Sequence, residues 1–166
     1  MVVVVICGTP GTGKSTVAKN MSEYGFKTIH LSKFVIENRL YMGYDRERDA
    51  YIIDKDKLRE SLEEILKDYD RVVIEGIGAE ALPRSWVDLC VVLVCEPYEL
   101  RRRLESRLFP PEKIEENLEA ERFGVILGEA ISNYGGSKVI VIDTTHNDFG
   151  RVVGVIMDEL QRRGLR

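Results

Sequence analysis

The run Gly8-Thr-Pro-Gly-Thr-Gly-Lys-Ser-Thr16 constrains the fold of this chain more than any other segment. It fits the pattern G-x-x-x-x-G-K-[ST], in which a glycine-rich turn lets backbone amides surround phosphate oxygens. Residues 1–7 before it are nearly all Val and Ile, and residues 14–21 after it have a helical composition. The sequence therefore predicts a strand, a phosphate-binding loop (P-loop) and a helix, which is the context that the motif requires.

Two side chains of this loop have a defined chemical task. Lys14 is expected to reach the β- and γ-phosphates of a nucleotide, and Ser15 offers a hydroxyl to a magnesium ion. The amino end of the following helix adds partial positive charge to the same place. A glycine-rich turn that binds nothing is the alternative, and the complete motif in its proper context argues against it.

Composition limits the other possibilities. The chain has 166 residues, 44% of them hydrophobic and 31% charged, which predicts one globular domain with a substantial core. The net charge of −4 does not favour a general or sequence-specific nucleic-acid surface. No run is long enough to span a membrane, and residues 1–7 lack the basic region of a signal peptide, so we expect no membrane association.

The three cysteines, Cys7, Cys90 and Cys95, all lie in apolar runs. An odd number of thiols in such places argues against a disulfide framework and indicates the reducing cytoplasm. With two histidines and no paired Cys/His spacing, we expect no zinc site.

Further along the chain, apolar runs alternate with helical patterns. Four more strands are expected, over 26–30, 71–75, 87–95 and 138–143. The run 87–95 is apolar almost throughout, which indicates burial on both faces, as in a parallel sheet. We therefore predict an α/β protein with a five-stranded parallel sheet flanked by helices and a ligand at the carboxyl ends of the strands.

The segments between these strands are expected to be mainly helical. Helices are predicted to begin at Ser32, Asp54, Pro97, about Glu112 and Asp148. The first is expected to end at Arg39, and the fourth to be a single long helix that ends at Asn133. Residues 40–53 lack a 3.6-residue period, and we interpret them as irregular or hairpin-like.

Two insertions narrow the class of P-loop protein. The base-reading N-K-x-D element of GTPases is absent, and the chain is too short for the accessory domains of most motor ATPases. Insertions after the second strand and after the fourth strand are typical of small nucleoside and nucleotide kinases of the P-loop NTPase fold. In that class one insertion holds the acceptor and the other closes as a lid.

Within this class the chain resembles the adenylate kinase isoenzyme 6 family. The matching segments are 8–16, Leu-Tyr-Met-Gly-Tyr-Asp at 40–45, Ile-Ile-Asp-Lys-Asp at 52–56, Pro83 with Trp86, 103–107 and 117–121. They extend over about the first 135 residues. The resemblance implies a single kinase domain of the nucleoside monophosphate kinase type over 1–166, with an acceptor-binding insertion at about 30–53 and a short lid at about 106–116.

The resemblance also implies roles for individual residues. For ATP it implies Gly11, Gly13, Lys14, Ser15, Thr16 and the lid residue Arg107, with His146 and Asn147 near the adenine. For the acceptor, the expected residues are Arg39, Tyr41, Gly43, Tyr44 and Asp45. Lys14, Glu75 and Arg107 are the expected catalytic residues, and Ser15 with Glu75 the expected magnesium site.

The sequence allows an alternative role for some of these residues. Arg107 either contacts the nucleotide or forms a surface ion pair with Glu112 or Glu115. Arg101, Arg102 and Arg103 fan over about 200° of a helix, so they cannot all face one phosphate. Glu75, a carboxylate at the end of a central strand, is hard to explain as core and is expected to hold magnesium or its water.

The acceptor insertion leaves more alternatives open. Tyr41 and Tyr44 either stack on an acceptor base or pack the insertion, and Asp45 either binds the acceptor or lies in a solvated loop. Trp86 is expected to pack rather than to function.

The chain departs from the family pattern at two positions. Ile77 stands where the family often has a histidine after the third strand, which weakens the case for histidine-dependent hydrolysis. Ile36 stands where adenylate kinases commonly have the arginine that binds the acceptor phosphate, and Arg39, one helical turn on, is expected to substitute for it.

The resemblance implies an ATP- and Mg²⁺-dependent enzyme that converts AMP and ATP to two ADP, with a broader acceptor range left open. It also implies ATPase activity and a role in small-ribosomal-subunit maturation, with a uS11-like small-subunit ribosomal protein and pre-ribosomal particles as partners. One alternative is an assembly ATPase with little kinase activity, and another is a P-loop kinase of a different small metabolite.

Overall fold

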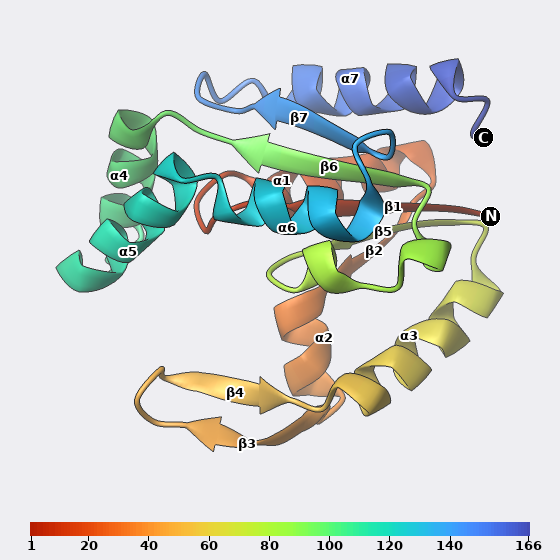
Figure 1. Cartoon of the computed structure of the whole chain (residues 1–166). Helices are drawn as coiled ribbons and strands as arrows, with labels where there is room; N and C mark the ends of the chain where they lie inside the picture. The colour runs from red at the N-terminus through yellow and green to blue at the C-terminus, as the bar shows by residue number, and fades with distance from the viewer.

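A five-stranded sheet forms the centre of the computed structural model, which describes residues 1–166 (Figure 1). Its strands are β1 (Val2–Cys7), β2 (Lys27–His30), β5 (Arg71–Glu75), β6 (Leu89–Val94) and β7 (Val139–Asp143). They pair in the order β2-β5-β1-β6-β7, and every pairing is parallel. This confirms the predicted sheet, and it places the carboxyl ends of all five strands along one edge.

Both faces of the sheet are covered, which explains why β1 contains no polar side chain. Alternate residues of β1 point to opposite faces. Val2, Val4 and Ile6 share one core cluster with α1 (Lys14–Met21) and α7 (Phe149–Arg162). Val3, Val5 and Cys7 share the other with α3 (Lys55–Asp68) and α6 (Val125–Tyr134). The molecule therefore has three layers, helix on sheet on helix (Figure 1).

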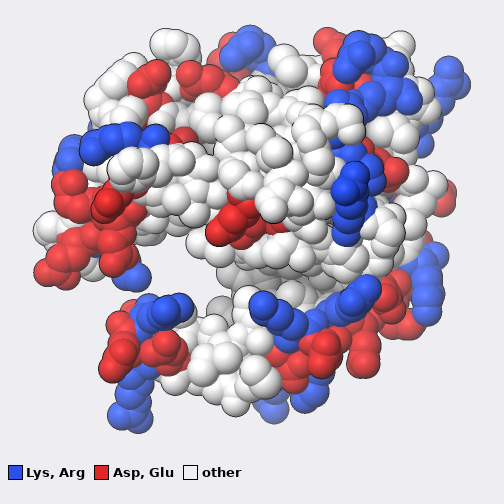
Figure 2. Space-filling model, in the orientation of Figure 1, with Lys and Arg blue, Asp and Glu red and all other residues white.

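Two insertions extend beyond the carboxyl edge of the sheet. One is the helix pair α4 (Pro97–Ser106) and α5 (Pro111–Arg122), which has a small core of its own. The other is α2 (Leu31–Glu37) followed by an antiparallel hairpin of β3 (Tyr41–Asp45) and β4 (Ala50–Ile53). Figure 2 shows a wide hollow between the hairpin and the α4–α5 pair. Short 3-10 turns complete the fold at Ser22–Tyr24, Ala79–Ala81 and Arg84–Trp86.

Several local predictions are confirmed. Asp54 and Asp148 cap α3 and α7, because their carboxylates accept hydrogen bonds from the backbone N–H groups of Lys57 and Arg151. Residues 40–53 form a hairpin. Trp86 packs against the core beneath the guanidinium of Arg59. None of the helices combines the length and the apolar character needed to cross a membrane.

Two helix boundaries differ from the prediction. Ser32 is not a cap, because α2 begins directly after β2 at Leu31, whose buried side chain anchors the start of the helix. The single helix expected over 112–133 is two helices, since Gly124 adopts a φ of 62° between α5 and α6. The break is needed because α5 packs on α4 whereas α6 packs on the sheet.

Candidate functional site

The P-loop joins β1 to α1 at the carboxyl edge of the sheet. Gly11 and Gly13 have φ angles of 92° and 102°, a region that residues with a Cβ rarely adopt. A Cβ on Gly13 would also lie 2.4 Å from Cε1 of the Phe149 ring, at the start of α7. Both the backbone angle and the packing therefore require glycine at position 13.

Lys14 lies folded over its own loop. Its Nζ donates to the carbonyl oxygens of Gly8 at 2.8 Å and Thr9 at 3.2 Å, and the residue is only 8% exposed. Burial lowers the pKa of Lys14 below its ordinary value, and the Arg107 guanidinium adds to this, while Glu75 opposes it. The ammonium group is thus held at the loop by weak, neutral acceptors, which phosphate oxygens could replace.

Glu75, the last residue of β5, lies beside the start of α1. Its Oε1 accepts hydrogen bonds from the Ser15 hydroxyl at 3.1 Å and from the His30 imidazole, whose Nδ1 is 2.7 Å away. The side chain of Glu75 is 6% exposed. The structure therefore brings together Ser15 and Glu75, the two residues expected at the magnesium site, and adds His30, to which the sequence assigned no role.

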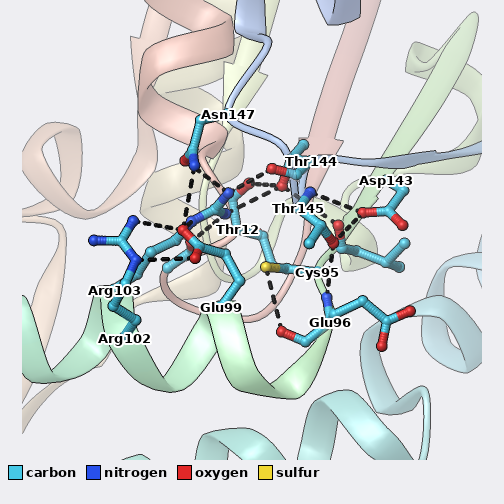
Figure 3. A network of polar contacts seen from close by, with 12 residues as sticks. Thr12, Cys95, Glu96, Glu99, Arg102, Arg103, Asp143, Thr144, Thr145 and Asn147 are labelled. Carbon is cyan, nitrogen blue, oxygen red and sulfur yellow. Dashed lines mark hydrogen bonds and ion pairs between the residues drawn. The ribbon is translucent and has the colours of Figure 1, made fainter.

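A second polar network ties the P-loop to α4 and to the loop after β7 (Figure 3). The Arg103 guanidinium donates to the carbonyl oxygens of Gly11, at 3.1 Å, and of Thr144. It also bonds to Asn147 Oδ1 at 2.9 Å and pairs with Glu99. The Thr144 hydroxyl in turn donates to the carbonyl oxygen of Thr12 at 2.6 Å. This network fixes the outer side of the loop, and its central residue, Arg103, lies inside the protein.

The two residues expected near the adenine lie in the loop between β7 and α7. Asn147 has a φ of 59°, and its side chain bridges Arg103 and Glu99. His146 is exposed. The loop containing both residues lies next to the P-loop, since Thr144 bonds directly to Thr12.

Arg107 ends α4 and is exposed. It forms no ion pair, and Glu115, its expected alternative partner, pairs instead with Arg101 at 2.7 Å. Arg102 pairs with Glu99. Each of the three arginines 101–103 therefore has an ion-pair partner within the protein, whereas Arg107, whose charge helps to lower the pKa of Lys14, has none. The lid region contains only the short turn between α4 and α5 and the adjoining helix ends.

The expected acceptor residues lie along the hairpin and mostly contact one another. The rings of Tyr41 and Tyr44 pack against Tyr51, with centroids 4.5 Å and 5.2 Å apart. Asp45 caps the turn by accepting from the backbone N–H groups of residues 47 and 48. Gly43 pairs with Ile52 across the hairpin, next to an irregularity in the register. These contacts favour packing for the tyrosines and a turn role for Asp45.

Arg39 is the remaining residue expected at the acceptor site. It follows the end of α2 in a left-handed conformation with a φ of 53°. This conformation closes the helix, with the N–H groups of Arg39 and Leu40 bonded to the carbonyl oxygens of Ile36 and Val35. Arg39 is exposed at the carboxyl end of α2, and its role toward the acceptor phosphate stays a prediction.

The residues present suit a nucleotide with magnesium better than a metal held by protein alone. No group of three or more His, Cys, Asp or Glu side chains is arranged to hold a metal ion. Magnesium needs only one or two protein oxygens when phosphates and waters fill its other positions, and Ser15 and Glu75 provide such oxygens.

Comparison with known proteins identifies the family of the chain. The family model described as "AAA domain" matches residues 4–124. A protein of Saccharolobus solfataricus, provisionally named an adenylate kinase, is 39% identical over 158 residues, which are 95% of this chain and 82% of that protein. The adenylate kinase isoenzyme 6 homolog of Caenorhabditis elegans is 38% identical over 133 residues, 79% of this chain and 73% of that protein.

Solved structures support the fold alone. Shikimate kinase from Acinetobacter baumannii, in complex with shikimate, has a TM-score of 0.66 at 14% identity, covering all of this chain and 96% of its own. A third sequence relative, from Saccharomyces cerevisiae, is also named as an adenylate kinase isoenzyme 6 homolog. It is 35% identical over 143 residues, which are 85% of this chain and 72% of that protein. The two relatives named for adenylate kinase isoenzyme 6, at 38% and 35% identity and with 73% and 72% of their length covered, show that the chain belongs to the adenylate kinase isoenzyme 6 family.

Proposed function

We propose that this chain is a nucleoside monophosphate kinase that transfers the γ-phosphoryl group of ATP to a monophosphate, with AMP among its acceptors. Family membership supports a phosphotransferase, and the adenylate kinase names of its relatives support AMP. The observation that carries the proposal is the convergence of Lys14, Ser15 and Glu75 at the carboxyl edge of the sheet, where Ser15 bonds to Glu75 and Lys14 folds over the P-loop.

Magnesium, held by Ser15 and Glu75, would supply positive charge that neutralises the phosphates of ATP. Lys14 is placed to exchange the carbonyl oxygens of its loop for those phosphate oxygens. Ser15 offers its hydroxyl to the ion, and Glu75 accepts a hydrogen bond from water on it. Arg107, free at the end of α4, provides a second positive charge for the group in transfer. These residues supply positioning and charge, which phosphoryl transfer chiefly requires.

We propose that the acceptor enters the hollow between the hairpin and the α4–α5 pair (Figure 2). This hollow adjoins the P-loop side of the sheet, and the hairpin forms its opposite wall. Tyr44 is 46% exposed, so it can contact an acceptor base even though its ring packs on Tyr51. His146 and Asn147, on the other side of the P-loop, are the proposed neighbours of the adenine of ATP.

We further propose slow ATP hydrolysis without an acceptor. Only the turn over 107–110 separates α4 from α5, so this lid is too short to exclude water completely. We also propose, from the resemblance seen in the sequence, a role in small-subunit maturation with a uS11-like ribosomal protein on pre-ribosomal particles. The three buried, free thiols suit the reducing cytoplasm.

A panel of nucleoside monophosphates incubated with Mg-ATP, beside an acceptor-free reaction, tests this proposal. ADP formation that depends on AMP is the expected result, and Glu75→Gln should reduce both turnover and its dependence on magnesium. Hydrolysis that no monophosphate accelerates would favour the ATPase switch instead. If no small-subunit protein binds the purified chain in a pull-down, the ribosomal role is wrong and the kinase stands alone.

A further inference from the structure

His30 is the second residue that contacts the Glu75 carboxylate. It is the last residue of β2 and lies directly opposite Glu75 in the parallel register of β2 and β5. Register partners on neighbouring strands project to the same face of the sheet. The 2.7 Å contact between His30 Nδ1 and Glu75 Oε1 is therefore built into the pairing of the edge strand β2 with its neighbour β5.

The Ser15 hydroxyl and the His30 imidazole are the only side-chain hydrogen-bond donors to Glu75, and both bond to Oε1. In the proposed reaction the Ser15 oxygen would face magnesium through a lone pair while its O–H still donates to Glu75, so Ser15 is shared between the ion and the carboxylate. A carboxylate that is only 6% exposed needs hydrogen-bond donors to hold it in place. The His30 imidazole is the donor to Glu75 that has no second task in the proposed reaction.

The chemistry of the contact fixes the direction of the hydrogen bond. An ionised carboxylate only accepts, so Nδ1 of His30 carries the hydrogen. The ring also lines a hollow of about 420 Å³ with Ser15, Thr16, Lys19, Ser32, Lys33 and Glu75, none of which is apolar. Glu75 thus meets this polar hollow with its orientation set from the β2 side.

We infer that His30 is a positioning residue, whose Nδ1–H holds the Glu75 carboxylate where it orients the water on magnesium. This inference rests on the proposed use of Mg-ATP. It assigns His30 no direct contact with the nucleotide, because the imidazole acts through the Glu75 carboxylate.

Three substitutions at one position test the inference. His30→Leu removes the donor, His30→Asn places an N–H close to the position of Nδ1, and His30→Gln places one close to that of Nε2. The dissociation constant of ATP is measured by calorimetry with Mg²⁺ and with EDTA, and thermal unfolding checks that each variant is folded. Loss of a residue that orients a metal ligand costs roughly 10–100-fold in metal affinity.

We expect His30→Leu and His30→Gln to lose about tenfold or more of the gain in affinity that Mg²⁺ gives, with binding in EDTA unchanged. His30→Asn should keep that gain within about threefold of the wild type. A folded His30→Leu variant with the full gain overturns the inference, as does His30→Asn behaving like His30→Leu. If neither the wild type nor Glu75→Gln binds ATP more tightly with Mg²⁺ than with EDTA, the proposed use of Mg-ATP fails. A failure of the inference about His30 alone leaves the Mg²⁺-dependent gain of the wild type intact, so the two failures are distinguishable.

Discussion

Replacing Gly13 by alanine tests how far the P-loop geometry is imposed by the rest of the protein. A residue with a Cβ at a φ of 102° costs about 1–2 kcal/mol. The new methyl group would also lie 2.4 Å from the Phe149 ring, and relieving such overpacking costs about 1–3 kcal/mol. Alanine restricts the unfolded chain more than glycine, which returns about 0.4–1 kcal/mol. We therefore expect Gly13→Ala to lower the free energy of unfolding by about 2–4 kcal/mol.

The two contributions can be separated with a double-mutant cycle. Phe149→Ala makes room for the methyl group but leaves the backbone angle unchanged. The cost of Gly13→Ala should therefore fall by about 1–3 kcal/mol in the Phe149→Ala background, which leaves the cost of the angle less the unfolded-chain effect, about 0–1.6 kcal/mol. Gly154→Ala is the matched control. Its Cβ would meet no atom within 4 Å in α7, so it should raise stability by about 0.5–1 kcal/mol.

Urea unfolding followed by circular dichroism provides these free energies, provided that the m-value stays constant. A cost for Gly13→Ala below about 1 kcal/mol would refute the claim that position 13 requires glycine. A cost that is the same with and without the Phe149 ring would show that the ring exerts no steric constraint, although the backbone argument would survive.

Three further predictions concern charged residues. Arg103→Ala should lower the melting temperature by on the order of 10 °C, because it breaks the buried ion pair with Glu99. Arg102→Ala is the control, since it removes an exposed partner of the same carboxylate and should change the melting temperature little. Equal shifts for the two variants would contradict this reasoning. Hydrogen bonds from Arg162 and Arg163 lower the pKa of Glu159 to about 2 from 4.5, so this carboxylate stabilises the fold above about pH 4.5 and that stability is lost as the pH falls toward 2. Urea midpoints between pH 7 and 2 should show this, with a shallower decline in Glu159→Gln. Lys14→Met should reduce turnover at least about a hundredfold in the AMP assay, and wild-type turnover in a folded variant would exclude a role for the ammonium group.

Strong local signals explain what could be predicted from the sequence. The P-loop, the alternating apolar runs and the capping aspartates each specify a short segment, and a parallel sheet flanked by helices follows from their alternation. The prediction of one long helix over 112–133 was wrong because a single glycine, Gly124, looks tolerable within a helical pattern, while the need to redirect α6 onto the sheet is a tertiary requirement. The role of Arg39 stays a prediction, and its left-handed conformation after α2 has no signal in the sequence.

The residues that the sequence missed depend on contacts between distant segments. Arg103 lies in a run of three arginines that looks alike throughout, and only the fold shows that it alone turns inward to Gly11 and Thr144. The sequence indicates a functional role for His30 only weakly. A polar residue at the carboxyl end of a predicted strand, beside another strand that ends in a carboxylate, would have identified the pair if the strand order had been known.

The central position of β1 has a consequence for synthesis of the chain. β1 leaves the ribosome first, yet its partners are residues 71–75 of β5 and 89–92 of β6. At about 5–20 residues per second, the uncharged segment Val-Val-Val-Val-Ile-Cys waits roughly 4–17 s for both neighbours, and such a segment can pair with other nascent chains. Thr144 and Phe149, which buttress the P-loop, emerge later still. ATP therefore cannot act as a folding template for most of translation, and chains truncated before α7 should have no more affinity for it than unfolded polypeptide.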